Sequence, residues 1–264
     1  MKRLPIGRLW SWAIFIAGFL YFFLPLLATF EFSLRAKPFG AAYGNAMKDP
    51  RFLGSLGYSF AIGLLTIVIS LAIIVPTAYW VRLKFPRIRP IVEFITLMPF
   101  VIPPVVLVFG LIRIYSQKPI QLTASDLGTN ALLVGAYVVL SFPYMYRAVD
   151  TGLAAMDVRS LTEAAQSMGA GWLRILLTVI FPNLRVALLS GAFLTLAIVV
   201  GEYTIASFLA RPAFGPYLSN VGQNKAYEPA ALSLISFALT WAAMGLIAFA
   251  GRGAQTRVQV AGAR

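Results

Sequence analysis

The stretch that decides the fold is SLGYSFAIGLLTIVISLAIIVPTAYWV, residues 55–81, which contains no charged side chain. A helix needs about 20 mostly apolar residues to cross the hydrocarbon core of a bilayer, and this segment exceeds that length. Backbone amides in lipid must be hydrogen-bonded within their own segment, so residues 55–81 are predicted to form a membrane-spanning helix. The chain is therefore expected to be an integral membrane protein.

Five further apolar segments lie along the same chain, and residues 130–146 form the weakest of them. We find no internal repeat and no stretch typical of a soluble domain. The prediction is an all-α integral membrane fold in a single domain, residues 1–264. Its six transmembrane helices are expected at about 9–30, 55–81, 91–114, 130–146, 186–209 and 229–250.

The overall composition agrees with a surface that faces lipid. Hydrophobic residues make up 59% of the chain and charged residues 12%, about half the charged fraction of a typical soluble domain. The chain has no cysteine and no histidine, which excludes disulfides, thiolate chemistry, imidazole catalysis and histidine-containing zinc sites. The 9 acidic residues are spread along the sequence, so neither catalytic residues nor metal ligands are predicted.

The charge distribution predicts how the chain is oriented. The 22 Lys and Arg residues exceed the 9 acids and gather between the apolar segments, as in membrane-flanking loops rather than on a nucleic-acid-binding face. With the N-terminus in the cytoplasm, 14 of the 22 lie on the inner side, among them Lys2, Arg3, Arg257 and Arg264. Both termini are therefore expected to be cytoplasmic.

In this topology residues 150–182 form a long cytoplasmic loop between the fourth and fifth helices. Within it, VRSLTEAAQSMGAGWLRILLTVIFP spans residues 158–182. Gly169 and Gly171 predict a turn between two short helices, and Pro182 suits the start of the fifth span. The apolar face could rest on lipid headgroups or dock on a protein, and periodicity alone does not distinguish these two alternatives. Its residues recur at the three- and four-residue steps of an amphipathic helix: Leu161, Ala164, Ala165, Met168 and Trp172.

This loop resembles the signature loop of binding-protein-dependent ABC importer permeases. The family pattern is Glu-Ala-Ala, three residues, Gly, nine residues, then Ile-x-Leu-Pro. Here Glu163-Ala164-Ala165, Gly169 and Pro182 keep that spacing, while Val179 and Phe181 replace the Ile and the Leu. The resemblance implies an inner-membrane, MetI-like permease subunit with the type I ABC importer permease fold, in a bacterial cytoplasmic membrane.

The same resemblance implies a mechanism and partners. Residues 150–182 would be the coupling loop that sits on a cytoplasmic ATPase dimer. In it, Gly169 would let the two short helices meet, and Glu163 would pair with the ATPase or cap the local backbone. No Walker motif occurs, so ATP and Mg²⁺ would be bound by the partner and this chain would not be an enzyme. A second permease subunit and an extracytoplasmic solute-binding protein are also implied. The loop residues assigned to coupling are Glu163, Ala164, Ala165, Met168, Gly169 and Pro182.

Two features suggest where a translocation pathway runs. Pro103 and Pro104 interrupt the third helix, which places it beside a cavity or gives an ordinary kink for packing. Glu202 is the one charged residue between residues 186 and 209, and Tyr203 and Thr204 follow it. An acid at this depth would be a gate or a contact for a cationic solute, or else would pair with Arg211 at the outer interface.

The solute is less clear from the sequence than the transport class. Residues 201–206, GEYTIA, resemble the branch of permeases that serves polyamines, with related members for ferric iron, thiamine and phosphonates. A single chain of this size fits the spermidine/putrescine type. The alternative class is a stand-alone secondary transporter, which would need several deep acids or repeated halves. An intramembrane enzyme or a membrane scaffold would leave the signature loop unexplained.

Overall fold

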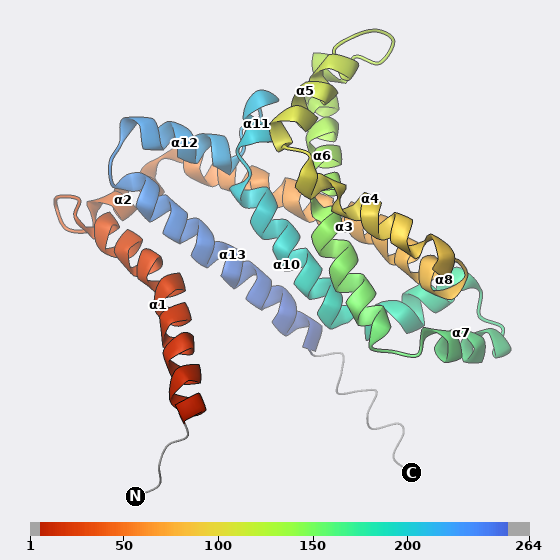
Figure 1. Cartoon of the computed structure of the whole chain (residues 1–264). Coiled ribbons are helices and arrows are strands. Elements are labelled where there is room, and N and C mark those ends of the chain that lie inside the picture. Colours follow the sequence, from red (N-terminus) through yellow and green to blue (C-terminus); the bar gives the residue numbers. More distant parts are fainter. Residues whose placement is uncertain (1–5, 253–264) are drawn as a thin grey trace, which may run out of the picture. The chain divides into compact units, whose positions relative to one another are not determined.

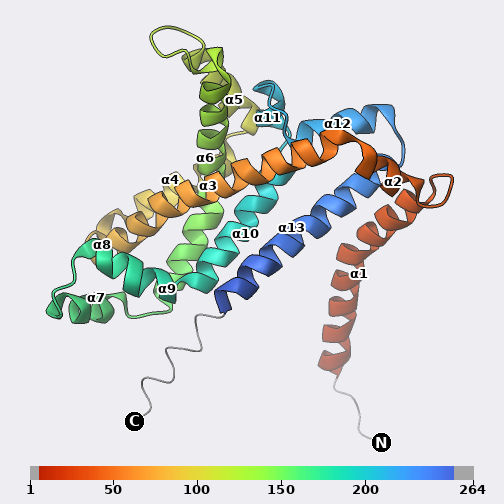
Figure 2. The same cartoon turned by 180° about the vertical axis from the view of Figure 1, so that it is seen from behind.

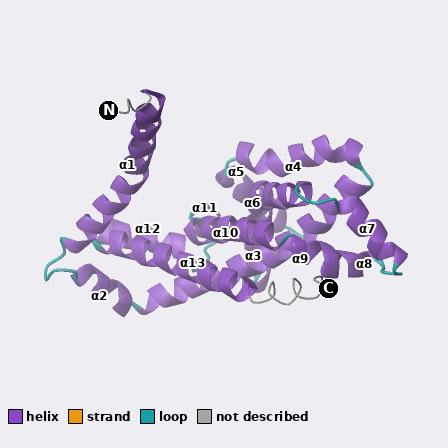
Figure 3. Cartoon of the chain, turned by 90° about the horizontal axis from the view of Figure 1, so that it is seen from below, coloured by secondary structure: helices purple, strands orange, loops and turns teal. Residues whose placement is uncertain are grey.

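The computed structural model describes residues 6–252, and all of the regular secondary structure in that range is helical, as Figure 3 shows. The terminal basic residues Lys2, Arg3, Arg257 and Arg264 lie outside the described residues. The chain divides into two compact units. The first combines the described residues up to Leu53 with Leu218–Ala238, and the second combines Gly54–Tyr217 with the residues from Leu239 onward.

Within the described residues, four helices are long and apolar enough to span a bilayer, and up to six spans result if each of two bent helix pairs counts as one. The long helices are α1 (Ile6–Leu34), α3 (Pro50–Leu83), α6 (Asp126–Ala154) and α13 (Glu228–Arg252), labelled in Figure 1. One bent pair joins η1 (Pro86–Ile88) and α4 (Arg89–Val101) to α5 (Pro104–Tyr115). The other joins α8 (Trp172–Ile175), the π-helical turn η3 (Leu176–Ile180) and α9 (Phe181–Asn183) to α10 (Arg185–Gly201).

The first unit contains α1, α2 (Ala41–Lys48) and the adjoining parts of α3, α12 (Phe214–Asn224) and α13. Its small core is built from alanines, with Ala42 and Ala231 fully buried. By contrast, every residue from 10 to 28 of α1 is exposed, although this helix is apolar on all sides. A helix that is hydrophobic all round requires an apolar environment, so α1 is suited to lipid or to another subunit.

The second unit is organised around α6. This helix packs against α10 and α4, and Figures 1 and 2 show α6 and α10 side by side from both directions. Gly152 permits that close approach, because a Cβ there would lie 2.7 Å from the Cβ of Ala187 and from Cδ2 of Leu184. The fully buried side chains of this core include Val108, Leu133, Tyr137, Val199 and Ile205.

The third expected helix, residues 91–114, is bent by 97° between α4 and α5. The break falls at Ile102 and Pro103, both of which have extended backbone angles. Pro103 and Pro104 lack the backbone N–H that a continuous helix needs, so α4 ends at Val101 and α5 restarts with Pro104 at its first turn. The break therefore follows from the proline pair.

The fifth expected helix, residues 186–209, is also interrupted. Helix α10 ends at Gly201, Glu202 is extended at φ −72° and ψ 128°, and α11 (Thr204–Phe208) begins after Tyr203. No proline lies in this segment, so sequence periodicity predicts one continuous helix where the structure has two. The cause is a side-chain interaction of Glu202, described below.

Candidate functional site

The loop after α6 folds into α7 (Val158–Ser167) and α8, joined by a glycine turn. Asp157 begins α7, since its Oδ1 accepts a hydrogen bond from the Ser160 amide at 3.1 Å and its Oδ2 one from the Ser160 hydroxyl at 2.6 Å. These bonds stabilise the carboxylate and hold the pKa of Asp157 below its ordinary value. Gly169 has φ 79°, a backbone conformation that glycine adopts without steric cost. The helix–turn–helix expected from the sequence is therefore present.

One face of α7 packs against other helices of the second unit, to which α7 itself belongs. The hydroxyl groups of Thr162 and Tyr79 lie 3.1 Å apart, which ties α7 directly to α3. Side chains of α8 and η3, the helical segments that follow α7, are buried as well. Because both short helices are packed in this way, a displacement of the loop would be transmitted to the membrane helices. The buried side chains are Val158, Thr162, Ala165, Ile175, Leu176 and Ile180.

The opposite face of this loop is exposed and partly apolar. Met168 is 81% exposed, and Trp172 and Leu173 are each 52% exposed. The structure thus divides the expected apolar face, with Ala165 turned inward and Met168 outward. We call Met168, Trp172 and Leu173 the loop patch. An exposed apolar patch of this kind is characteristic of a surface that contacts another molecule.

Three other loop residues singled out from the sequence are also exposed: Glu163, Ala164 and Pro182. Glu163 accepts a hydrogen bond from Nε of Arg159 at 2.8 Å, one turn earlier on α7, and this bond raises the pKa of Arg159. Both side chains are more than half exposed, so the pair contributes little to stability. Ala164 is exposed beside it. Pro182 lies in α9, exposed, next to the 80° bend that leads into α10.

A groove of about 1000 Å³ is lined by residues of α4, α6, α9 and α10 and by the segment that follows α6. Its lining is mostly apolar, with Tyr144, Thr151 and Ser190 among its polar groups and Arg147 as its charged residue. Arg147 is exposed and has no ion-pair partner among residues 6–252. The lining includes Ala155 and Met156, which precede α7, and Asn183 of α9, so the groove approaches the α7–α8 loop at that end.

A smaller cavity of about 380 Å³ continues the groove, sharing Phe100 and Tyr144 with it. Its wall contains both helix breaks, with Pro104 from one and Glu202 from the other. Pro103 and Tyr203 are exposed at the breaks themselves, and Thr204 starts α11. Of the predicted pathway residues, Pro104 and Glu202 thus line one cavity, and the other three are their neighbours in the chain, whereas the loop residues lie elsewhere. The two groups are separated by the 17 residues of α10, roughly 25 Å at 1.5 Å per residue.

Glu202 is held in the second break by three hydrogen bonds. Its Oε1 accepts from the amide of Ile205 at 2.8 Å, and its Oε2 accepts from the amide of Ala206 at 3.1 Å and from the hydroxyl of Tyr137 at 2.9 Å. The carboxylate therefore caps the N-terminus of α11, where free amides favour a negative charge. Arg211 binds Asp126 at 2.9 Å instead of Glu202.

Sequence reasoning missed three residues of this region. Tyr137 lies in an apolar run that gives no sign of a partner 65 residues away. Arg147 follows the end that was expected for the fourth helix, but α6 continues to Ala154 and carries Arg147 into the groove. Asp150, on the same extension of α6, was not identified at all. The signal that was available was the uninterrupted helical pattern beyond residue 146.

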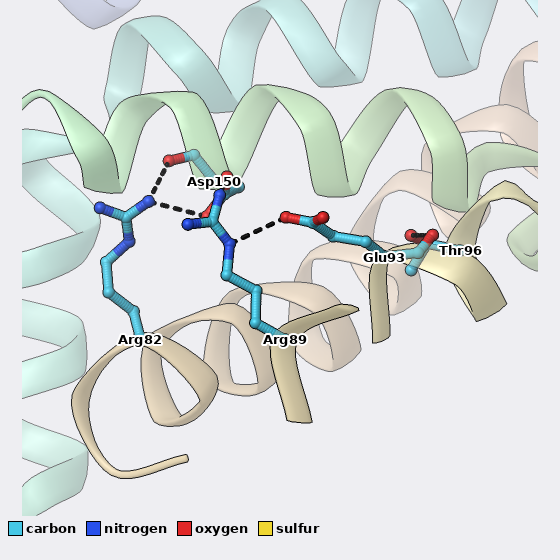
Figure 4. A network of polar contacts seen from close by, with 5 residues as sticks. All are labelled: Arg82, Arg89, Glu93, Thr96 and Asp150. Carbon is cyan, nitrogen blue, oxygen red and sulfur yellow. Dashed lines mark hydrogen bonds and ion pairs between the residues drawn. The ribbon is translucent and has the colours of Figure 1, made fainter. Parts of the chain in front are cut away.

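Asp150 is the centre of an ion-pair network drawn in Figure 4. Its two carboxylate oxygens bind Nη2 of Arg82 and Nη2 of Arg89, each at 2.9 Å. Arg89 also binds Glu93 at 2.8 Å through Nε. The network joins the end of α3 and the start of α4 to α6. It therefore fixes the three helices to one another near the end of α6 that leads into α7.

The described residues contain no group of three or more Asp and Glu side chains close enough to hold a metal ion. The described residues present an exposed apolar loop surface, a groove and a capped helix break.

Comparison with known proteins gives the family. Residues 74–257 match the model of the "Binding-protein-dependent transport system inner membrane component". The chain is 25% identical over 224 residues to the putrescine transport system permease protein PotI of Escherichia coli K12, covering 80% of this chain and 79% of PotI. It is 28% identical over 160 residues to the molybdenum transport system permease protein ModB of Azotobacter vinelandii, covering 58% of this chain and 70% of ModB.

A solved structure has the same fold. The chain aligns with a bacterial ABC transporter involved in the import of the acidic polysaccharide alginate, with a TM-score of 0.64, 20% identity, 94% of this chain covered and 98% of that one. The family match covers more than half of the chain. The protein therefore belongs to the binding-protein-dependent transport system inner membrane components, the non-catalytic permease subunits of ABC importers, whose ATPase is a separate subunit.

Proposed function

We propose that this chain forms one half of the translocation pathway of an ABC importer and that α7 and α8 couple it to a cytoplasmic ATPase dimer. The observation that carries this proposal is the loop patch. Met168, Trp172 and Leu173 are exposed, while the opposite face of the same loop is packed against the membrane helices. Such a segment has one surface for a partner and one for the spans.

Coupling would proceed from the ATPase through this loop. ATP and Mg²⁺ would be bound by the ATPase, whose closure moves the loop patch. Thr162 and Tyr79 would carry the motion to α3, and α9 would carry it to α10. The ion pairs of Asp150 would make α3, α4 and α6 move together. On this proposal, Gly169 allows the turn and Glu163 is free to exchange Arg159 for a basic group of the partner.

The pathway itself would lie along the groove between α6 and α10. One chain supplies only one wall, so we propose a second permease subunit, identical or homologous, as the other. An extracytoplasmic solute-binding protein would deliver the solute to the end that carries Glu202. In this arrangement the loop, and with it both termini, lies on the cytoplasmic side of a bacterial inner membrane, which agrees with the distribution of Lys and Arg.

The first candidate for the solute is a polyamine of the spermidine/putrescine type. It is supported by the similarity to the putrescine permease, which extends over 80% of this chain, and by an acidic residue in the smaller cavity. The carboxylate of Glu202 would then attract an ammonium group as the solute enters the groove.

A second candidate is an oxyanion. Two observations favour it: Arg147 is the charged residue of the large groove, and the charge of Glu202 is already balanced by three hydrogen-bond donors. A polycation passing Arg147 would meet an unpaired positive charge without an acid to offset it. The similarity to a molybdenum permease agrees with this alternative.

A pull-down in mild detergent tests the transport class. The tagged protein is purified as wild type and as the Glu163→Lys/Gly169→Val variant, and the ATPase that accompanies it is identified. We expect an ATPase subunit with the wild type and its loss, or the loss of its coupling, in the variant. If no ATPase accompanies the wild type, a stand-alone secondary transporter becomes the better interpretation.

Uptake by whole cells separates the two solutes. Cells that express the complete system are given labelled putrescine or labelled molybdate, with wild type, Arg147→Gln and Glu202→Gln compared. A polyamine pathway predicts putrescine uptake that falls in Glu202→Gln. An oxyanion pathway predicts molybdate uptake that falls in Arg147→Gln while Glu202→Gln keeps most of it. Uptake of neither solute would reject both candidates.

A further inference from the structure

The basic residues at the junction of α3 and α4 form two groups with different surroundings. Arg82 and Arg89 are neutralised by Asp150 and Glu93 together. Lys84 and Arg87 are exposed, and neither has an ion-pair partner among residues 6–252. Two unbalanced positive charges therefore remain at the surface where the apolar run of α3 ends.

A groove of about 580 Å³ is lined in part by Lys84, and Arg87 is the neighbour in the chain of another lining residue, Ile88. Lys84 is the charged residue that lines the groove. Thr77 lines it with a hydroxyl group, which already donates a hydrogen bond to the carbonyl of Ile73 at 2.6 Å. The groove thus offers one cation at the edge of an apolar channel. Most of its wall is apolar and includes Trp80, Val81, Phe85, Ile88 and Val92.

The position of Lys84 is defined by Trp80. The ammonium nitrogen lies 4.5 Å from the centre of the indole ring, within the range of a cation–π interaction. Tryptophan and lysine side chains are both enriched where membrane helices reach the headgroup layer. The pair places a positive charge at that level, directly above the apolar channel.

We propose that this groove binds one anionic phospholipid, with the phosphate at Lys84 and Arg87 and an acyl chain along Trp80, Phe85, Ile88 and Val92. The site suits both parts of this ligand. Its cations attract the anionic headgroup, and its apolar channel packs against the acyl chain. A free phosphate would use the cations and leave the apolar wall unoccupied.

The site adjoins the coupling loop. On the far side of the groove wall, the rings of Trp80 and Trp172 pack with centroids 6.2 Å apart. Trp172 belongs to the loop patch, so a lipid against Trp80 supports one of the residues proposed to contact the ATPase. This consequence rests on the proposed function, whereas lipid binding itself requires only that the chain spans a bilayer.

Native mass spectrometry of the purified full chain tests the site. The protein in detergent is mixed with equal amounts of phosphatidylglycerol and phosphatidylcholine, and the ratio of the two bound lipids is measured. We expect wild type to favour phosphatidylglycerol and Lys84→Glu/Arg87→Glu to lower that ratio at least about fivefold, since each cation contributes to the headgroup attraction. The charge-conserving Lys84→Arg/Arg87→Lys should keep the ratio of the wild type.

The matched control reverses two exposed basic residues at the other end of the α4–α5 pair, in Arg113→Glu/Lys118→Glu. This variant should keep the ratio, because it has the same net charge change at a different place. If the Glu variant is not recovered as a monodisperse protein, Lys84→Gln/Arg87→Gln replaces it, with a smaller decrease expected.

Several results would overturn the proposal. Wild type without a preference for phosphatidylglycerol would do so, as would an unchanged ratio in both the Glu and the Gln variants. Displacement of the lipid by millimolar inorganic phosphate would identify a free-anion site instead. An unchanged lipid ratio with loss of the accompanying ATPase would assign Lys84 and Arg87 to the ATPase contact. None of these results depends on transport, so the proposed function is tested separately.

Discussion

The two helix breaks that meet at the smaller cavity are made in different ways. The break between α4 and α5 is caused by the local sequence, because Pro103 and Pro104 cannot continue a helix. The break between α10 and α11 depends on one side chain, Glu202, whose carboxylate satisfies the first amides of α11 and binds Tyr137 on another helix. A local cause holds the first break, and a tertiary contact holds the second.

This difference has consequences for stability and for function. A proline break persists in any surroundings, so α4 and α5 should remain bent whatever the rest of the protein does. A carboxylate break persists only while the carboxylate and Tyr137 remain together. The α10–α11 break is therefore the one that a change in tertiary contacts can remove, and the following predictions test the contrast.

The largest effect is expected for Glu202→Ala. Loss of the cap should cost about 1 kcal/mol, and loss of the bond from Tyr137 about 1.5 kcal/mol, for a total of about 2.5 kcal/mol. Thermal unfolding of the purified protein in detergent measures the change. The control is Glu163→Ala, which removes an exposed carboxylate from α7 and should lower stability by less than about 0.5 kcal/mol. Equal effects at the two positions would contradict the assignment of Glu202 as a cap.

A smaller loss is expected for Tyr137→Phe. This substitution keeps the buried ring and removes only the hydroxyl that donates to Glu202 at 2.9 Å. We expect a loss of about 1.5 kcal/mol, since the acceptor is charged. In the Glu202→Ala background the same substitution should cost much less, because its partner is absent. Additive losses in this double-mutant cycle would show that the two residues do not interact. Tyr203→Phe, on an exposed side chain at the same break, serves as the control.

Replacing the proline pair should change stability less. In Pro103→Ala/Pro104→Ala the backbone gains two amides, but Phe109 of α5 still packs on Phe208 of α11 with ring centroids 4.8 Å apart. We expect the segment between α4 and α5 to gain helical hydrogen bonds and the bend to decrease, with stability changing by less than about 1 kcal/mol, partly through greater freedom of the unfolded chain. Hydrogen exchange of the peptide that covers residues 98–108 reports whether the helix becomes continuous. No gain in protection would contradict a break that is held by the prolines.

The smallest effect concerns a second carboxylate cap, that of Asp157 on α7, which is exposed. Its pKa is lowered in the folded protein, so the cap contributes above the ordinary carboxyl pKa and is lost as the pH falls through the lowered value. Hydrogen exchange, corrected for the intrinsic rate, should show the Ser160 amide losing protection as the solution is acidified below pH about 4. In Asp157→Asn, whose side chain does not titrate, protection should not vary with pH. Identical pH profiles would assign the effect to another group.

The contrast between the breaks also explains what the sequence could predict. The proline bend and the glycine turn of α7–α8 depend on residues near one another in the chain, and both are present in the structure. The described residues also contain four helices able to span a bilayer, or up to six spans if each bent pair counts as one. The α10–α11 break depends on Tyr137, which is 65 residues from Glu202. Arg147 and Asp150 belong to the site because α6 extends beyond the apolar segment. The length of α6 is set by its packing on α10 and α4. Residues whose role depends on distant partners were therefore missed.

Site-specific cross-linking tests the central claim most directly. The chain has no cysteine, so Met168→Cys places a single reactive thiol in the loop patch, and Lys118→Cys places one at an exposed position outside it. Each variant is purified in mild detergent with its accompanying proteins and treated with a short cross-linker that joins a thiol to a lysine. The account predicts a cross-link from Cys at position 168 to an ATPase subunit and none from position 118. An ATPase that co-purifies but is cross-linked only from position 118, or from neither position, would contradict coupling through α7 and α8.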